Sequence, residues 1–189
     1  MDAIVEAALR KWPNVPHCHG WLGLDARGDW YLRDQQTQAA GAFPFAKGSR
    51  IEHAGLLAFI ARNYAADAVG CWYFQNGPQR VYVELESAPW VWRLAETGAQ
   101  LCIETHTARP AQFESAWLDE SGRVFIATDL GLGLVHSVDV ERASSAVERG
   151  LWRINECEFE ALAARFGHVL SPAALRAAVV AQAQICSDG

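Results

Sequence analysis

The feature that most constrains the fold is a two-residue hydrophobic alternation that runs from Cys71 to Val135. Val81, Val83 and Leu85 alternate with polar neighbours, as in a half-buried strand. The same pattern predicts further strands at 90–94, 101–105, 113–117 and 123–128. Short turns rich in Gly, Pro, Asn and Asp separate them, which favours pairing between sequential neighbours. The sequence therefore predicts an antiparallel meander sheet of five or more strands.

Helical periodicity flanks this stretch on both sides. Helices are predicted for 2–12, 49–70, 139–150, 155–167 and 171–182. Together with the sheet they indicate an α+β fold in which helices pack on one face of the meander and the C-terminus is helical.

Particular residues support two of these helices. Ser49 and Glu52 have the spacing of a capping box at the start of the second helix. In the last helix Leu175 and Val179 are expected to face inward.

The segments before residue 50 are less regular. Residues 19–24 and 29–33 predict an early hairpin. Residues 34–49 read as one long loop, and the sequence leaves open whether it is ordered.

The length of 189 residues suits a single α+β domain over 1–189. A subdivision into a sheet-rich part, 1–135, and a helical part, 136–189, is the alternative.

Composition and charge exclude several classes of function. Hydrophobic residues make up 51% and charged residues 20%, which is typical of a globular chain. A net charge of −6 repels nucleic acid and anionic lipid. The chain lacks the apolar run of roughly 20 residues that a membrane helix requires. Five cysteines without a CxxC pair, and an N-terminus unlike a signal peptide, predict a cytoplasmic protein with reduced thiols and no cofactor.

The cluster His17-Cys18-His19 has the side chains that zinc and copper prefer. In an extended segment His17 and His19 point to one side and Cys18 to the other, so two ligands at most converge. The cluster is therefore a candidate metal site or a candidate Cys/His nucleophile, and the alternative is the polar start of a hairpin strand.

A second candidate site combines residues of the meander. Glu104 and His106 share a strand face and form a candidate acid/base pair. If neighbouring strands align, Tyr82, Glu84 and Arg93 join them in one patch. The alternative is a solvated sheet face on which Arg93 balances its carboxylate neighbours.

Binding candidates lie at a turn, on a strand and among the tryptophans. Asn76 and Arg80 flank a tight turn, and Tyr82 follows on the next strand, so these side chains can contact a partner. Trp90 and Trp92 share one face of a strand and are expected to line an apolar cavity or to fill the core.

Three stretches of the chain resemble a known family. They are Trp12-Pro13-Asn14-Val15-Pro16 through Gly20-Trp21-Leu22, Asn63-Tyr64 through Gln75-Asn76-Gly77-Pro78-Gln79-Arg80-Val81-Tyr82-Val83, and Trp117-Leu118-Asp119 through Leu130-Gly131. The chain is similar here to proteobacterial proteins grouped as a domain of unknown function. The resemblance implies a bacterial cytoplasmic origin and assigns no activity or site residue.

These observations favour a non-enzymatic binding or interaction domain that recognises a protein partner or a small apolar ligand. The alternative is a small hydrolase or metal-assisted enzyme that uses His17, Cys18 and His19 or the Glu104/His106 pair. The sequence leaves the ligand, the pathway and the oligomeric state open.

Overall fold

A computed structural model describes residues 1–97 and 100–187. Contacts divide the chain into two compact units, each with its own sheet. Unit 1 comprises 1–24, 30–86 and 169–189, and unit 2 comprises 25–29 and 87–168. The boundaries between the two units, near residues 86 and 168, differ from the boundary at residue 135 between a sheet-rich and a helical part that the sequence offered as an alternative. The single folding domain stays a prediction, because two compact units can still unfold together.

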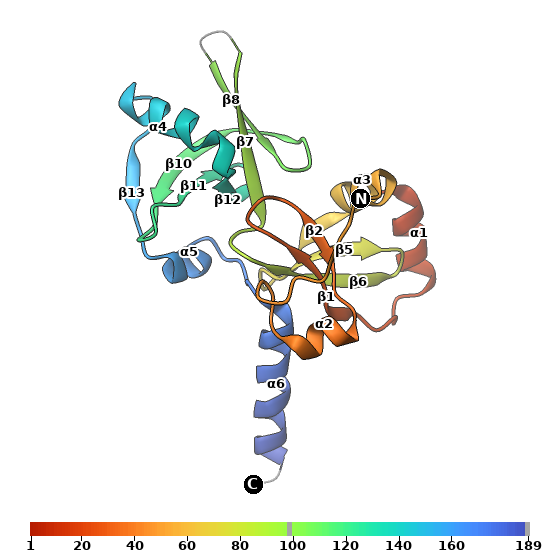
Figure 1. Cartoon of the computed structure of the whole chain (residues 1–189). Coiled ribbons are helices and arrows are strands. Elements are labelled where there is room, and N and C mark those ends of the chain that lie inside the picture. The colour runs from red at the N-terminus through yellow and green to blue at the C-terminus, as the bar shows by residue number, and fades with distance from the viewer. Residues whose placement is uncertain (98–99, 188–189) are drawn as a thin grey trace. The chain divides into compact units, whose positions relative to one another are not determined.

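The sheet of unit 1 is mixed (Figure 1). Its six strands follow the order β3 (Ser49–Arg50), β2 (Trp30–Leu32), β1 (Cys18–Leu24), β6 (Gln79–Leu85), β5 (Trp72–Asn76) and β4 (Tyr64–Ala66). Strands β1 and β6 pair in parallel, and the other neighbours pair antiparallel. The predicted hairpin 19–24/29–33 is confirmed as β1 and β2.

Helices α1 (Ala3–Lys11) and α3 (Ala54–Arg62) contribute to the core of unit 1, where Val5 and Ile60 are buried. On α3, Phe59 packs edge-on against Phe74 of β5, with 5.3 Å between ring centroids. Because side chains alternate along a strand, Tyr73 points to the opposite sheet face from Phe74.

The predicted start of α3 is wrong. Ser49 belongs to β3, which pairs with β2, and the helix begins only after His53. The His53 side chain takes the capping role, because its Nδ1 accepts a hydrogen bond from the Leu56 backbone N–H at 3.1 Å.

The segment 34–49 is ordered around a buried arginine. It contains α2 (Gln35–Ala40), which Asp34 caps by accepting from the Thr37 backbone N–H at 2.8 Å. The Arg33 guanidinium donates to the carbonyl oxygens of Gly20, Gly41 and Ala46 at 2.6–3.1 Å. These bonds tie the segment to β1.

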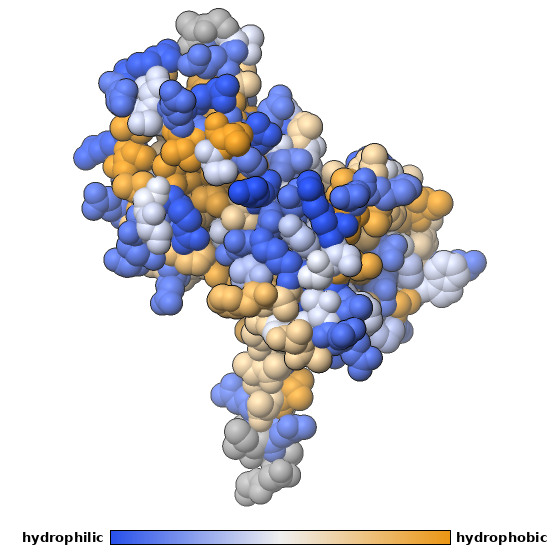
Figure 2. Space-filling view, in the orientation of Figure 1, coloured by the Kyte–Doolittle hydropathy of each residue, from blue (hydrophilic) through white to orange (hydrophobic). Residues whose placement is uncertain are grey.

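Helix α6 (Pro172–Ser187) confirms the helical C-terminus, but its predicted inward face is wrong. Leu175 is 40% exposed and Val179 is 60% exposed. Only the start of α6 lies on the sheet of unit 1, and the remaining turns extend away from it (Figure 1). Figure 2 shows pale and orange apolar residues along this exposed part.

The sheet of unit 2 is also mixed, so a purely antiparallel meander is wrong. Its seven strands follow the order β13 (Ile154–Glu156), β10 (Phe113–Leu118), β11 (Val124–Thr128), β12 (Gly131–Val135), β7 (Trp90–Thr97), β8 (Gln100–Thr105) and β9 (Pro110–Ala111). Every strand predicted after residue 90 is present. However, β12 returns to pair in parallel with β7, and β13 pairs in parallel with β10.

Trp90 and Trp92 of β7 belong to the core of unit 2. Both are fully buried, and their indole N–H groups donate to the carbonyl oxygens of Leu130 and Ile126 at 2.8 Å. Gly133 on β12 leaves room for them, since a Cβ at this position would overlap the Trp92 indole. The indoles thus fill the core where the sequence left open a ligand cavity.

Short helical segments complete unit 2: η1 (Ser137–Asp139), α4 (Val140–Glu148) and α5 (Phe159–Arg165). Buried Asp139 accepts from Arg93 and Arg142, each at 2.6 Å. On α4, Ala143 and Ala146 are buried, and the helix predicted over 139–150 is confirmed, although Val140 is exposed. Among the described residues no helix is both long and apolar enough to cross a membrane.

Candidate functional site

Parallel pairing of β1 with β6 brings four of the sequence candidates together in unit 1. Cys18 pairs with Val81, so His17 and His19 lie on the same sheet face as Arg80 and Tyr82. The His19 ring stacks on the Tyr82 ring at 4.5 Å between centroids, and the His17 ring meets its edge at 6.0 Å. Residues 63 positions apart in the sequence therefore form one cluster.

Strand β5 and helix α6 extend this cluster. Tyr73 is the antiparallel partner of Tyr82, and the Arg80 guanidinium lies over the Tyr73 ring at 4.4 Å. From α6, Arg176 Nη1 lies 2.9 Å from His19 Nδ1. We call this surface the Tyr82 face; it consists of His17, His19, Tyr73, Arg80, Tyr82 and Arg176.

Two carboxylates on the same side of the sheet are occupied by structural hydrogen bonds. Asp67 Oδ1 accepts from the backbone N–H groups of Val69 and Cys71, and its Oδ2 accepts from the Tyr82 hydroxyl at 3.0 Å. Glu84 accepts from Ser171 Oγ at 2.5 Å and from the Ala173 N–H at 3.1 Å. Asp67 thus holds Tyr82, and Glu84 holds the start of α6 against β6.

The protonation of the Tyr82 face follows from burial and from the two arginines. Burial, together with Arg80 and Arg176, lowers the pKa of His17. Burial and Arg176 likewise lower the pKa of His19. Both imidazoles are therefore neutral at pH 7, next to two permanent guanidinium charges.

Hydrogen bonding also determines which nitrogen carries the proton. His17 Nδ1 accepts from the Arg80 backbone N–H at 3.4 Å. Arg176 has no acceptor, so His19 Nδ1 must be the acceptor in their contact. A neutral imidazole with an accepting Nδ1 carries its proton on Nε2, so both rings carry an Nε2–H. A backbone hydrogen bond with His17 acts against the lowering of the His19 pKa.

An open cavity of about 470 Å³ lies beside the cluster. It is lined by Ala66, Asp67, Ala68, Val69, Tyr73 and Arg80. Arg80 and Tyr73 therefore belong both to the Tyr82 face and to this cavity.

The remaining sequence candidates lie elsewhere. Asn76 is exposed at the β5–β6 turn. Glu104 is exposed on β8, whereas the His106 imidazole is buried; its Nδ1 accepts from the Val91 N–H at 3.2 Å and its ring lies 5.9 Å from Trp90.

The combined patch predicted around Tyr82 is wrong. Tyr82 and Glu84 belong to the sheet of unit 1, whereas Arg93, Glu104 and His106 belong to unit 2. Glu104 is opposite Arg93 in the β7–β8 register, but Arg93 forms its ion pair with Asp139.

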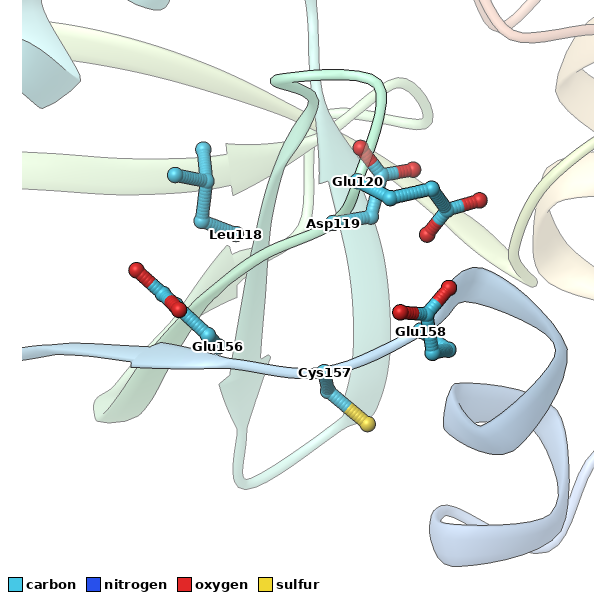
Figure 3. Close-up of a pocket in the computed structure, with 6 residues that line it drawn as sticks. All are labelled: Leu118, Asp119, Glu120, Glu156, Cys157 and Glu158. Carbon is cyan, nitrogen blue, oxygen red and sulfur yellow. The ribbon is translucent and has the colours of Figure 1, made fainter.

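Unit 2 contains a second, acidic pocket of about 560 Å³ (Figure 3). Asp119 Oδ1 accepts from the backbone N–H groups of Ser121 and Arg123, and its Oδ2 accepts from the Arg123 guanidinium. Glu120 accepts from the Phe159 N–H at 2.9 Å. In Figure 3 the Cys157 thiol points away from these carboxylates, in agreement with its packing on the core that contains Leu162. Within 1–97 and 100–187 no group of three or more His, Cys, Asp or Glu residues is arranged to hold a metal ion.

Comparison with known proteins identifies the family. A family model, DUF2944, described as a protein of unknown function (DUF2946), matches residues 1–184. The chain belongs to this family. None of the curated proteins compared with it matches this DUF2944 member.

Two solved structures have some similarity to the DUF2944 chain. A DUF1285 family protein from Shewanella baltica OS155 is 15% identical, with a TM-score of 0.46 over 67% of this chain and 91% of its own. A DUF1285 family protein from Silicibacter pomeroyi DSS-3 is 13% identical, with a TM-score of 0.45 over 77% of this chain and 84% of its own.

The sequence analysis did not identify Tyr73, Asp67 or Arg176 as parts of a site. Arg176 carried a signal, because it is the only charged residue in the otherwise apolar α6 segment. Tyr73 and Asp67 carried none, since each looks like an ordinary strand or turn residue.

Proposed function

We propose that this DUF2944 protein is a non-enzymatic binding domain of the bacterial cytoplasm, and that its ligand docks on the Tyr82 face. The observation that carries the proposal is the convergence of His17, His19, Arg80 and Arg176 around the buried rings of Tyr73 and Tyr82. These side chains come from β1, β6 and α6, and each presents a hydrogen-bond donor.

The adjoining open cavity offers a ligand of the Tyr82 face a second area of contact. Binding sites are concave and combine aromatic walls with a few polar groups. The cavity beside Arg80 shares part of this composition, since Val69 supplies apolar surface, Arg80 supplies charge and the largely buried Tyr73 ring lies in its lining. Because Trp90 and Trp92 fill the core of unit 2, the apolar-cavity version of the hypothesis loses its support.

Metal-assisted catalysis at His17 and His19 is less well supported. Two guanidinium groups next to the imidazoles repel a cation. The Nδ1 atoms of both rings also have donors, which leaves at most the Nε2 atoms for coordination.

Ligand screening by protein-detected NMR tests the proposal. The 15N-labelled full chain would be mixed with compounds that cover neutral, cationic, anionic and apolar chemistry. We expect at least one class to shift the amides of residues 17–19 and 80–82 saturably. Hits that map only to the acidic pocket at Asp119, or to no surface, would contradict the proposal.

A substitution separates docking from folding. Arg176→Gln removes an exposed charge of the Tyr82 face, and Arg10→Gln removes an exposed charge from α1 as the matched control. If the hit is an anion, Arg176→Gln should weaken its binding and Arg10→Gln should not. If the hit is not an anion, His19→Ala is the test variant in place of Arg176→Gln. Thermal unfolding of each variant verifies that the fold is retained.

A further inference from the structure

The charges of the Tyr82 face indicate the chemistry of its ligand. Arg62, Arg93, Arg123, Arg142 and Arg149 each form an ion pair with a carboxylate. Within the described residues Arg80 and Arg176 form no such ion pair: Arg80 lies over Tyr73, hydrogen-bonds Tyr82 and is attracted at longer range by Asp67, and Arg176 contacts His19. Two cations that flank one surface without a carboxylate ion pair are a recognition element for an anion.

The two histidines add neutral donors between these cations. Arg80 donates through its backbone to His17, and Arg176 contacts His19, so each ring is oriented by the arginine next to it. With Nδ1 accepting, each Nε2–H is a donor. An oxyanion accepts from N–H groups and offers several lone pairs, so it can satisfy donors of both kinds at once.

The carboxylates nearby do not prevent such binding, although they limit its strength. Asp67 accepts from two backbone N–H groups and the Tyr82 hydroxyl, and Glu84 accepts from Ser171 and Ala173, so both carboxylates are held in place by structural hydrogen bonds. Their charges still oppose an anion at longer range, which predicts a modest affinity for a minimal ion.

We infer that the ligand of the Tyr82 face carries an oxyanion of phosphate type, held by Arg80 and Arg176 with His17 and His19 as additional donors. This inference rests on the proposed function and narrows it to a ligand class. A dianion is favoured over a monoanionic carboxylate, because two guanidinium charges face it. The adjoining cavity accommodates the remainder of a small phosphorylated molecule.

Inorganic phosphate is the probe for this inference. Long-range 1H–15N spectra of the full chain at pH 7 report the protonation and tautomer of each histidine. Phosphate, sulfate and acetate would be titrated separately against chloride at constant ionic strength. We expect saturable shifts of His17 and His19 with phosphate, with an apparent Kd on the order of millimolar for such a minimal ion. Sulfate should act similarly if charge dominates, and acetate should bind more weakly.

Variants make the result specific. Arg80→Gln and Arg176→Gln should each weaken phosphate binding by about tenfold, since each loses a charge-assisted hydrogen bond. Arg10→Gln is the control and should leave it unchanged. Arg176 is exposed, so Arg176→Gln keeps the test informative even if Arg80→Gln unfolds the chain.

Three outcomes overturn the inference. The first is that the shifts of His17 and His19 do not saturate with phosphate. The second is that these shifts are equal in wild type and Arg176→Gln. The third is that exposed His53 shifts as much as His17 and His19. If phosphate fails while a neutral compound shifts residues 17–19 and 80–82, the ligand class is wrong and the proposed function stands. If no compound of any class perturbs the face, both are wrong.

Discussion

Glu84 shows how one buried carboxylate connects distant parts of unit 1. Burial raises its pKa above the ordinary value, although the hydrogen bonds from Ser171 and Ala173 act in the opposite direction. A group whose folded pKa is raised favours folding while protonated. This contribution is complete below the ordinary value of 4.5 and is lost as the pH rises through the folded pKa.

Glu84→Gln is therefore expected to change the pH dependence of stability. The amide is neutral at every pH and its oxygen can still accept from the Ala173 N–H. Relative to Glu84→Gln, wild type should lose free energy of unfolding as the pH rises from 4.5 towards 7. Urea unfolding at several pH values measures the difference, with exposed Glu6→Gln as the control. A constant difference across this range would contradict the prediction.

His106 predicts the opposite dependence in unit 2. Burial lowers its pKa to about 3, so the folded chain stays neutral at His106 while the unfolded chain takes up a proton below 6.5. Its contribution to stability is present above pH 6.5 and falls as the pH drops from 6.5 towards 3, by up to about 1.4 kcal/mol per pH unit. In urea unfolding between pH 7 and 5, His106→Asn should give a shallower slope than wild type. Parallel slopes would show that His106 titrates alike in both states.

At the scale of elements, α6 shows what an apolar pattern leaves undetermined. Its sequence predicts an inward face, yet Leu175 and Val179 are exposed. Val179→Lys should therefore change the free energy of unfolding by no more than about 0.5 kcal/mol, as expected of a surface site. Urea unfolding at two protein concentrations checks this. A concentration-dependent loss of more than 2 kcal/mol would instead show that Val179 is buried in an oligomer.

The sheets show a similar division between local and long-range information. Alternation identified the strands predicted between residues 81 and 128 correctly, because it reports which residues face a core, whereas β3, β4 and the end of β13 fell within predicted helices. It carries no information on partners, so the parallel pairings of β1 with β6 and β12 with β7 were missed. Ser49 and Glu52 have a capping-box spacing, but the pairing of β3 with β2 outweighs that local preference.

The candidate site was predictable in its residue types and not in its assembly. His17, His19, Arg80 and Tyr82 stood out by their chemistry in two separate stretches of sequence. Their proximity depends on the parallel β1–β6 pairing, and Arg176 arrives from α6. Neither contact has a local signal in the chain.

At the scale of the whole molecule, unit 1 is discontinuous in sequence, and its last segment, which begins at Val169, supports the sheet of unit 1. Leu170 O accepts from the Leu85 N–H at 2.8 Å, and Val169 bridges to Cys71. In a chain that ends at residue 168, the Leu85 N–H, the Gly70 carbonyl and the Glu84 carboxylate lose these hydrogen bonds, each at a cost of roughly 1–3 kcal/mol.

Hydrogen exchange tests this dependence. The chain that ends at 168 should lose amide protection in β1 and β6 and retain it in β7 and β12. A chain that ends at 178 keeps Ser171, Ala173 and Arg176, and should be protected like the full chain. Equal protection of β6 in both truncated chains would show that the returning segment does not stabilise unit 1.

The late return of the chain to unit 1 also determines when the Tyr82 face is complete during synthesis. Ser171 follows Glu84 by 87 positions. At about 5–20 residues per second, a ribosome needs roughly 4–17 seconds to cover that interval. Until then Glu84 lacks the hydroxyl and amide that it binds, and Arg176 does not yet exist. A nascent chain therefore completes the Tyr82 face, with both of its arginines, only after the whole of unit 2 has been translated.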